Sequence, residues 1–149
     1  MTSNLPPRVA RHRGLSIIEL TVVIAILLTL ISVLFIGSRA WRRGSDRAGC
    51  VLTVRNVQLA TRSYQSMYGY NYGGRPYAED GTQDIVAHLY SKGYIEQRLF
   101  QQARGTATCP SGGLYDITVP DTFPPQGELF MTCSLSKSED HEPGAHSDW

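Results

Sequence analysis

The hydrophobic residues of this chain are concentrated in one run near its start. Residues 15–36 are mostly apolar, contain neither proline nor glycine, and include a single charged residue, Glu19. A helix over this range would be about 33 Å long, which matches the ~30 Å hydrocarbon core of a bilayer. The run is longer than the core of a secretory signal peptide, and a poor cleavage site follows it. The pattern therefore predicts a transmembrane helix over 15–36.

Farther along, apolar positions recur at alternating steps of four and three, which is the spacing of one stripe along a helix. We therefore expect the same helix to continue over 37–69, with glycines as possible bending points, and to pack a small head along this stripe. Turn-forming residues then end the helix. The stripe consists of Cys50, Val54, Val57, Thr61, Tyr64 and Tyr68, and the glycines are Gly37, Gly44 and Gly49.

The remainder of the chain predicts a small head over 70–136 that contains both helix and strand. A short helix is expected over Asp84–Lys92, capped by Thr82 or Asp84 and stopped by Gly93. His88 on this helix is expected to be structural or exposed, and one or two more helical turns are expected over 95–102. The polar residues from 137 to 149 predict a disordered tail.

Two strand-like segments, Leu114–Val119 and Glu128–Ser134, are separated by a loop with proline and glycine and predict a β-hairpin. In antiparallel pairing, Cys109 precedes the first strand and comes near the end of the second, where Cys133 lies. A Cys109–Cys133 disulfide is therefore geometrically sensible if the head lies outside the cytosol. It would leave Cys50 unpaired, because the chain has 3 cysteines.

Charge is unevenly distributed, although the formal net charge is only +1. The leader over 1–14 contains three arginines and no acid, which favours a cytoplasmic N-terminus under the positive-inside rule, whereas a second basic cluster over 39–47 opposes it. From Cys50 onward there are seven basic and eleven acidic residues. An acidic head argues against non-specific binding of polyanions as its main task.

Several tyrosines near Arg75 are compatible with stacking on nucleic acid bases. The acidic head favours the alternative, in which the tyrosines pack a loop against the long helix. We therefore do not expect nucleic acid as a partner. These residues are Tyr64, Tyr68, Tyr70, Tyr72 and Tyr77.

Glu19 is the residue of the apolar run that most needs an explanation. A carboxylate on a membrane helix costs a few kcal/mol at the bilayer centre, less near an end, and usually marks a function with a partner. Glu19 lies about 7 Å along the helix from Gly14. The apolar run has no basic residue to pair with it, so the partner has to come from elsewhere.

A basic leader, the residues Gly14-Leu15-Ser16-Ile17-Ile18-Glu19, and a long apolar helix follow one another at the start of the chain. This order resembles the cleavage and methylation motif of type IV prepilins and type II secretion pseudopilins. The resemblance implies an α+β, type IV pilin-like fold, cleavage by prepilin peptidase between Gly14 and Leu15, and N-methylation of the new terminus. Leu15 departs from the phenylalanine that is most common in the family. The freed amine would pair with Glu19 of a neighbouring subunit.

The resemblance further implies a structural subunit of a type II secretion pseudopilus or type IV pilus-like fibre, and not an enzyme. The chain would cross the bacterial inner membrane once, with a cytoplasmic N-terminus and a periplasmic head, before joining a fibre in the periplasm or at the cell surface. Expected partners are copies of itself, other pilin-like subunits, prepilin peptidase, and an inner-membrane assembly platform with a cytoplasmic ATPase. The alternative is a minor pilin that binds DNA or a surface.

The residues from Cys109 to Tyr115, with a second cysteine about twenty residues later, also resemble the C-terminal hairpin of one pseudopilin-like subgroup. No resident cofactor is expected. A zinc set of Cys109, Cys133, His141 and His146 matches no compact ligand spacing, so a disulfide is the preferred interpretation. Calcium is the weaker hypothesis for the hairpin, because some major pseudopilins bind it in a C-terminal loop. Its acidic residues are Asp116, Asp121 and Glu128.

Overall fold

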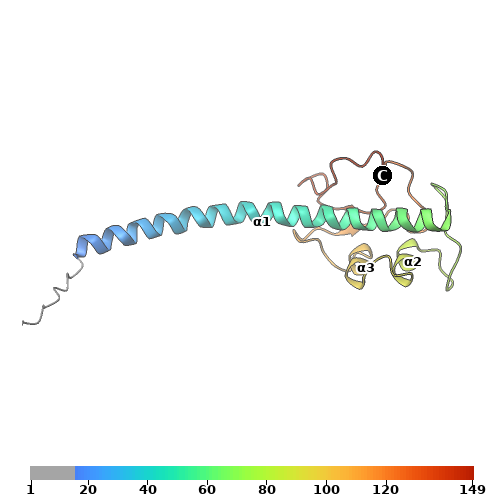
Figure 1. Cartoon of the computed structure of the whole chain (residues 1–149), viewed down its shortest axis with the longest axis horizontal. Helices are drawn as coiled ribbons and strands as arrows, with labels where there is room; N and C mark the ends of the chain where they lie inside the picture. Colours follow the sequence, from blue (N-terminus) through green and yellow to red (C-terminus); the bar gives the residue numbers. More distant parts are fainter. Residues whose placement is uncertain (1–15) are drawn as a thin grey trace, which may run out of the picture. The chain divides into compact units, whose positions relative to one another are not determined.

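The computed structural model describes residues 16–149 (Figure 1). The chain forms two compact units, one ending at Ala40 and one spanning Trp41–Trp149, and the first helix contributes to both. A long helix, two short helices and a two-stranded antiparallel sheet confirm the predicted α+β class. The elements are α1 (Ile17–Tyr68), α2 (Ile85–Ser91), α3 (Gln97–Ala103), β1 (Tyr115–Asp116) and β2 (Thr132–Cys133).

The first unit presents apolar side chains on every face of α1. Each large apolar residue from Ile17 to Ile36 is exposed, by 46% to 83%. The hydroxyls in this stretch donate to carbonyls of their own helix, as Thr21 does to Ile18 at 2.9 Å, so they need no water. An 18-residue window has a mean hydropathy of 2.9. The helix is therefore long and apolar enough to cross a membrane.

The second half of α1 buries one stripe, as its spacing predicts. Cys50, Val54, Val57, Thr61 and Tyr64 are each at most 2% exposed, and helical structure continues through the three glycines. Tyr68 is the exception among the stripe residues, because 45% of its surface is exposed. This stripe forms one wall of the head's core. The other core residues include Ile85, Val86, Leu89, Phe123 and Met131.

The two short helices agree with their sequence signals. The Asp84 carboxylate caps α2 by accepting a 3.0 Å hydrogen bond from the Ala87 backbone N–H. Gly93 follows α2 with a φ of +77°, a conformation that costs other residues a steric penalty. His88 is buried, and its Nε2 donates to the Thr82 carbonyl at 3.0 Å, which leaves Nδ1 to accept from the Tyr64 hydroxyl. The structural interpretation of His88 is therefore the correct one.

Tyr64 lies at the centre of an aromatic cluster that fixes the loop after α1. Its ring centroid lies 4.8 Å from that of Tyr68, 5.7 Å from that of Tyr70 and 6.0 Å from that of Phe123. Such pairs stabilise a core beyond the area they bury. These tyrosines therefore pack the loop onto the helix.

The β-hairpin is much shorter than the sequence predicts. Register pairs Tyr115 with Cys133 and Asp116 with Thr132, and regular pairing stops there. The reason is that the second segment bonds elsewhere: Gln58 on α1 donates to the Glu128 carbonyl at 3.1 Å and accepts from the Phe130 N–H at 2.8 Å. Each backbone group needs one partner, and here a side chain of α1 takes the place of a strand.

Residues 137–149, predicted to be disordered, instead pack against α1. Arg62 donates from its guanidinium to the Pro124, Pro125 and Trp149 carbonyls at 2.7, 2.8 and 3.0 Å. Arg47 pairs with Asp140. The segment lies across α1 from α2 and α3 (Figure 1). Its polar composition cannot build a core, but arginines on α1 supply partners for its backbone.

We predict that Arg62→Ala loosens both the C-terminal segment and the loop with Pro124 and Pro125, because one carbonyl of the segment and two of the loop lose a charged donor. The expected loss is about 1.5–3 kcal/mol in the free energy of unfolding of the head. Hydrogen exchange should accelerate at the Gly127 amide, which donates to Trp149. Arg98→Ala, an exposed arginine of α3, is the control and should change stability by less than about 0.5 kcal/mol. Equal effects of the two variants would contradict the assignment.

Candidate functional site

Two parts of the chain contain the residues that the sequence singled out. The processing residues Gly14 and Leu15 lie outside the described residues. Glu19 lies in the first turn of α1, where it is exposed and its N–H donates to the Ser16 carbonyl at 3.0 Å. A carboxylate is favourable near a helix N-terminus because of the helix dipole. The next basic residue along the helix is Arg39, about 30 Å away, so no described side chain of the helix neutralises Glu19.

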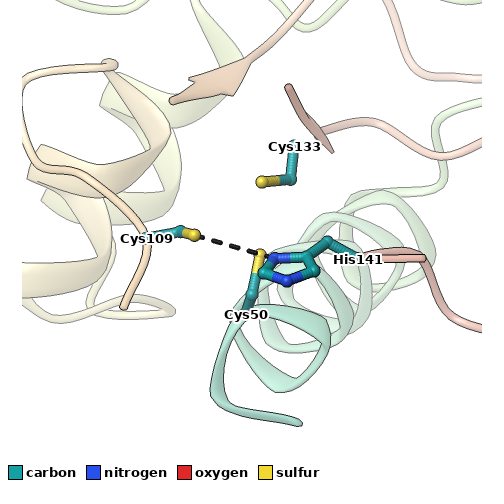
Figure 2. A group of neighbouring side chains, drawn as sticks. All are labelled: Cys50, Cys109, Cys133 and His141. Atoms are coloured by element: carbon teal, nitrogen blue, oxygen red, sulfur yellow. Dashed lines mark hydrogen bonds between the residues drawn. The ribbon is translucent and has the colours of Figure 1, made fainter. Parts of the chain in front are cut away.

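The head contains a cluster that the sequence did not predict. Cys50, Cys109, Cys133 and His141 are all buried, and their ligand atoms lie within 4.8 Å of one another (Figure 2). Each residue comes from a different part of the chain. We call this set the Cys₃His cluster.

The hairpin positions two members of the Cys₃His cluster. Cys109 and Cys133 each begin a tight turn, closed by Gly112 N–H to the Cys109 carbonyl at 2.8 Å and by Ser136 N–H to the Cys133 carbonyl at 2.9 Å. The register that pairs Tyr115 with Cys133 brings the two turns to the same end of the sheet. The two cysteines that the sequence pairs therefore lie close together.

The other two members come from α1 and from the C-terminal segment. Cys50 is the first residue of the buried stripe of α1 and is completely buried. His141 is 1% exposed, and its Nδ1 lies 3.7 Å from Cys109 Sγ. Its other ring nitrogen, Nε2, lies 3.7 Å from a Glu139 carboxylate oxygen. The imidazole therefore has one nitrogen toward the sulfurs and the other toward an acid.

The predicted Cys109–Cys133 disulfide is not formed in the structure, in which all three cysteines are free thiols. The two cysteines do not form an isolated pair, because ligand atoms of Cys50 and His141 also lie within 4.8 Å of them. Burial raises the pKa of Cys50 well above its ordinary value and also raises that of Cys133. The Leu135 backbone N–H, which hydrogen-bonds to Cys133, acts in the opposite direction.

The zinc set considered from the sequence contained the wrong histidine. His146 lies apart from the sulfurs, with Nδ1 3.0 Å from the Pro143 carbonyl and Nε2 3.6 Å from Glu142. The cluster keeps Cys109, Cys133 and His141 from that set and has Cys50 in place of His146. Sequence spacing failed here because the four ligands lie on segments that only the fold brings together. The available signal was a cysteine at the start of the buried stripe.

The acids considered for calcium do not come together. Asp121 pairs with Arg75 at 3.4 Å. Within the part of the chain that the structure describes, the Cys₃His cluster is the one group of three or more acidic, cysteine or histidine side chains that is close enough to hold an ion. The structure therefore offers no shared site for Asp116, Asp121 and Glu128.

Comparison of the chain with protein-family models, curated proteins and solved structures finds no match. The case for a function therefore depends on the residues of this chain.

We predict that Gly113→Ala disturbs the Cys₃His cluster. A Cβ at this position would lie 2.8 Å from Leu135 Cγ and 3.0 Å from Cys133 Sγ, which is too close without a shift of the hairpin. We expect the free energy of unfolding, measured with reductant and chelator present, to fall by about 1–3 kcal/mol. Gly144→Ala is the matched control, because nothing lies within 4 Å of its added Cβ. If Gly113→Ala leaves the free energy of unfolding unchanged, the turn is looser than described.

Proposed function

We propose that the chain is a structural subunit of a pseudopilus or type IV pilus-like fibre, inserted in the membrane before assembly. The observation that carries this proposal is Glu19, the one charge on a helical surface that is otherwise apolar on every face from Ile17 to Ile36. The helix dipole favours a carboxylate in this first turn, but a simple membrane anchor does not require one inside the bilayer. A fibre subunit does have a use for the carboxylate, because it can pair with a cation of a neighbouring subunit.

The apolar surface of α1 supports the same proposal. A helix that is hydrophobic all round has to be covered on all sides, by lipid or by other helices. In a fibre, lipid covers it before assembly and the helices of neighbouring subunits cover it afterwards. Both surroundings exclude water from the same side chains, so the helix can pass from one to the other.

Glu19 then sets the register between subunits. Cleavage after Gly14 would create an amine at Leu15, and this cation would pair with Glu19 of the next subunit. In an apolar surrounding, a carboxylate without its partner is costly, and misaligned helices would leave it unpaired. The pair therefore selects one axial position whatever its net energy.

Charge on the head is compatible with packing beside this core. The residues from Cys50 onward are net acidic, and a basic cluster over 39–47 precedes them. In the proposed fibre, this basic cluster faces lipid headgroups before assembly or acidic surfaces of neighbours after it. Salt would weaken the latter contacts.

We predict that prepilin peptidase shortens the chain by its first 14 residues. Intact mass and N-terminal sequencing of the product, after coexpression with the peptidase, should place the new terminus at Leu15. Gly14→Arg should block the cut, because the residue before the scissile bond belongs to the motif. Arg8→Ala, elsewhere in the leader, should leave the product unchanged. Failure of the wild-type chain to be cut would contradict the proposed processing.

We also predict that Glu19→Ala abolishes fibres while cleavage and membrane insertion continue. Fibres sheared from native cells, or released from their periplasm, would be collected by sedimentation and quantified with an antibody against the head. Thr29→Ala is the control, because Thr29 is a polar residue of the same helix whose hydroxyl donates to its own Ile26 carbonyl.

Normal fibres from Glu19→Ala would contradict the proposal. The alternative of a minor, DNA-binding pilin makes a different prediction. In that case the purified chain in detergent would retard DNA in a gel, and added salt would abolish the shift.

A further inference from the structure

We propose that the Cys₃His cluster is a structural zinc site in the head. The four ligands are the thiolates of Cys50, Cys109 and Cys133 and the Nδ1 nitrogen of His141. This inference goes beyond the proposed fibre role and does not depend on it.

The spacing of the four ligand atoms matches tetrahedral zinc. With Zn–S bonds of about 2.3 Å, sulfurs around one ion are about 3.8 Å apart, and a sulfur and a nitrogen are slightly closer. The observed Cys109 Sγ to His141 Nδ1 distance is 3.7 Å, and all ligand atoms lie within 4.8 Å of one another. Small side-chain rotations would therefore bring all four within reach of one ion. Three thiolates and an imidazole form a donor set typical of closed structural zinc sites.

The outer neighbours of the ligands fit the same assignment. A metal-bound histidine usually directs its second nitrogen to a carboxylate, a carbonyl or water, and Nε2 of His141 lies 3.7 Å from Glu139. The Leu135 backbone N–H also donates a hydrogen bond to the Cys133 sulfur. Binding would replace the three thiol protons with one ion, and these protons would pass to solvent.

The site is closed, yet it borders an entry path. All four ligand residues are at most 2% exposed, so the ion would have no open coordination position of the kind that catalytic zinc keeps. An open hollow of ≈ 870 Å³ reaches His141 and is lined also by Glu139, Arg43 and Arg47.

Zinc also accounts for what a disulfide leaves unexplained. A Cys109–Cys133 bridge uses two of the 3 cysteines and gives Cys50 and His141 no role. One ion uses all four residues and ties together α1, both turns of the hairpin and the C-terminal segment. A head with a small core gains most from such a link.

The test uses the full chain in detergent, purified under reducing conditions without a polyhistidine tag. After dialysis against excess Zn²⁺ and then metal-free buffer, elemental analysis should find about one zinc per chain. Co²⁺ added to metal-free protein should give the intense visible bands of tetrahedral cobalt together with thiolate-to-cobalt charge-transfer bands. Chelation of the zinc should lower the Tm of the head. The wild-type spectrum needs no variant and so does not depend on a variant folding.

Single substitutions separate zinc from a disulfide. Zinc predicts that Cys50→Ser, Cys109→Ser, Cys133→Ser and His141→Ala each weaken binding by at least about tenfold, since even outer neighbours of a site contribute that much. A disulfide predicts that Cys50→Ser is harmless. His146→Ala is the control from the same segment, because His146 lies with Glu142 and outside the cluster.

The role of Glu139, the acid beside His141, can be tested with one variant and one matched control. Glu139→Ala should reduce zinc affinity by about 10–100-fold. Glu142→Ala, which removes the acid beside His146, should not reduce it.

Three results would overturn the proposal. The first is a Cys109–Cys133 disulfide, found by mass spectrometry without reduction, in protein isolated from its native cells. The second is iron with acid-labile sulfide in place of zinc. The third is octahedral, weak cobalt absorption from the wild-type chain, which would show that the four residues do not share an ion.

Discussion

The structure depends on one helix that has to satisfy two different surroundings. From Ile17 to Ile36, α1 is apolar on every face, and from Cys50 to Tyr64 it buries a single stripe. The first half needs a continuous apolar environment, whereas the second half needs one compact partner and tolerates water elsewhere. The same helix meets both needs. The head therefore packs on the part of α1 where apolar residues occupy one stripe and no longer every face. Glu19 is the exception within the first pattern, and the proposed function is built on that exception.

The head compensates for a small core with polar contacts made by α1. The Gln58 side chain makes the backbone hydrogen bonds that a neighbouring strand would make to residues 128–130. The Arg62 guanidinium donates to carbonyls of two separate segments. These contacts hold the irregular segments that the short sheet cannot. The Cys₃His cluster lies at the other end of the buried stripe, where the hairpin turns and the C-terminal segment meet α1. A bound ion there would supply the link that buried area alone does not supply in so small a domain.

Local signals in the sequence were sufficient for the parts of the fold that local physics decides. The apolar run, the buried stripe, the Asp84 cap and the Gly93 stop each depend on residues within a few positions of one another. The hairpin was predicted with the correct partners but with strands that are too long. Strand pairing past Asp116 was lost because Gln58, far away in the sequence, takes the hydrogen bonds of the second segment. The C-terminal segment was misjudged for the same reason, since its partners Arg47 and Arg62 lie on α1.

The long helix, its two hydrophobic patterns and the motif around Glu19 can be read directly from the sequence, because periodicity and composition act along one element. The members of the Cys₃His cluster follow from the packing of distant segments. Cys50 and His141 are separated by most of the head, and no spacing rule links them. The fold brings them within 4.8 Å because the hairpin turns and the C-terminal segment converge on the start of the buried stripe. Local propensity cannot report that convergence, which is decided by packing between distant segments.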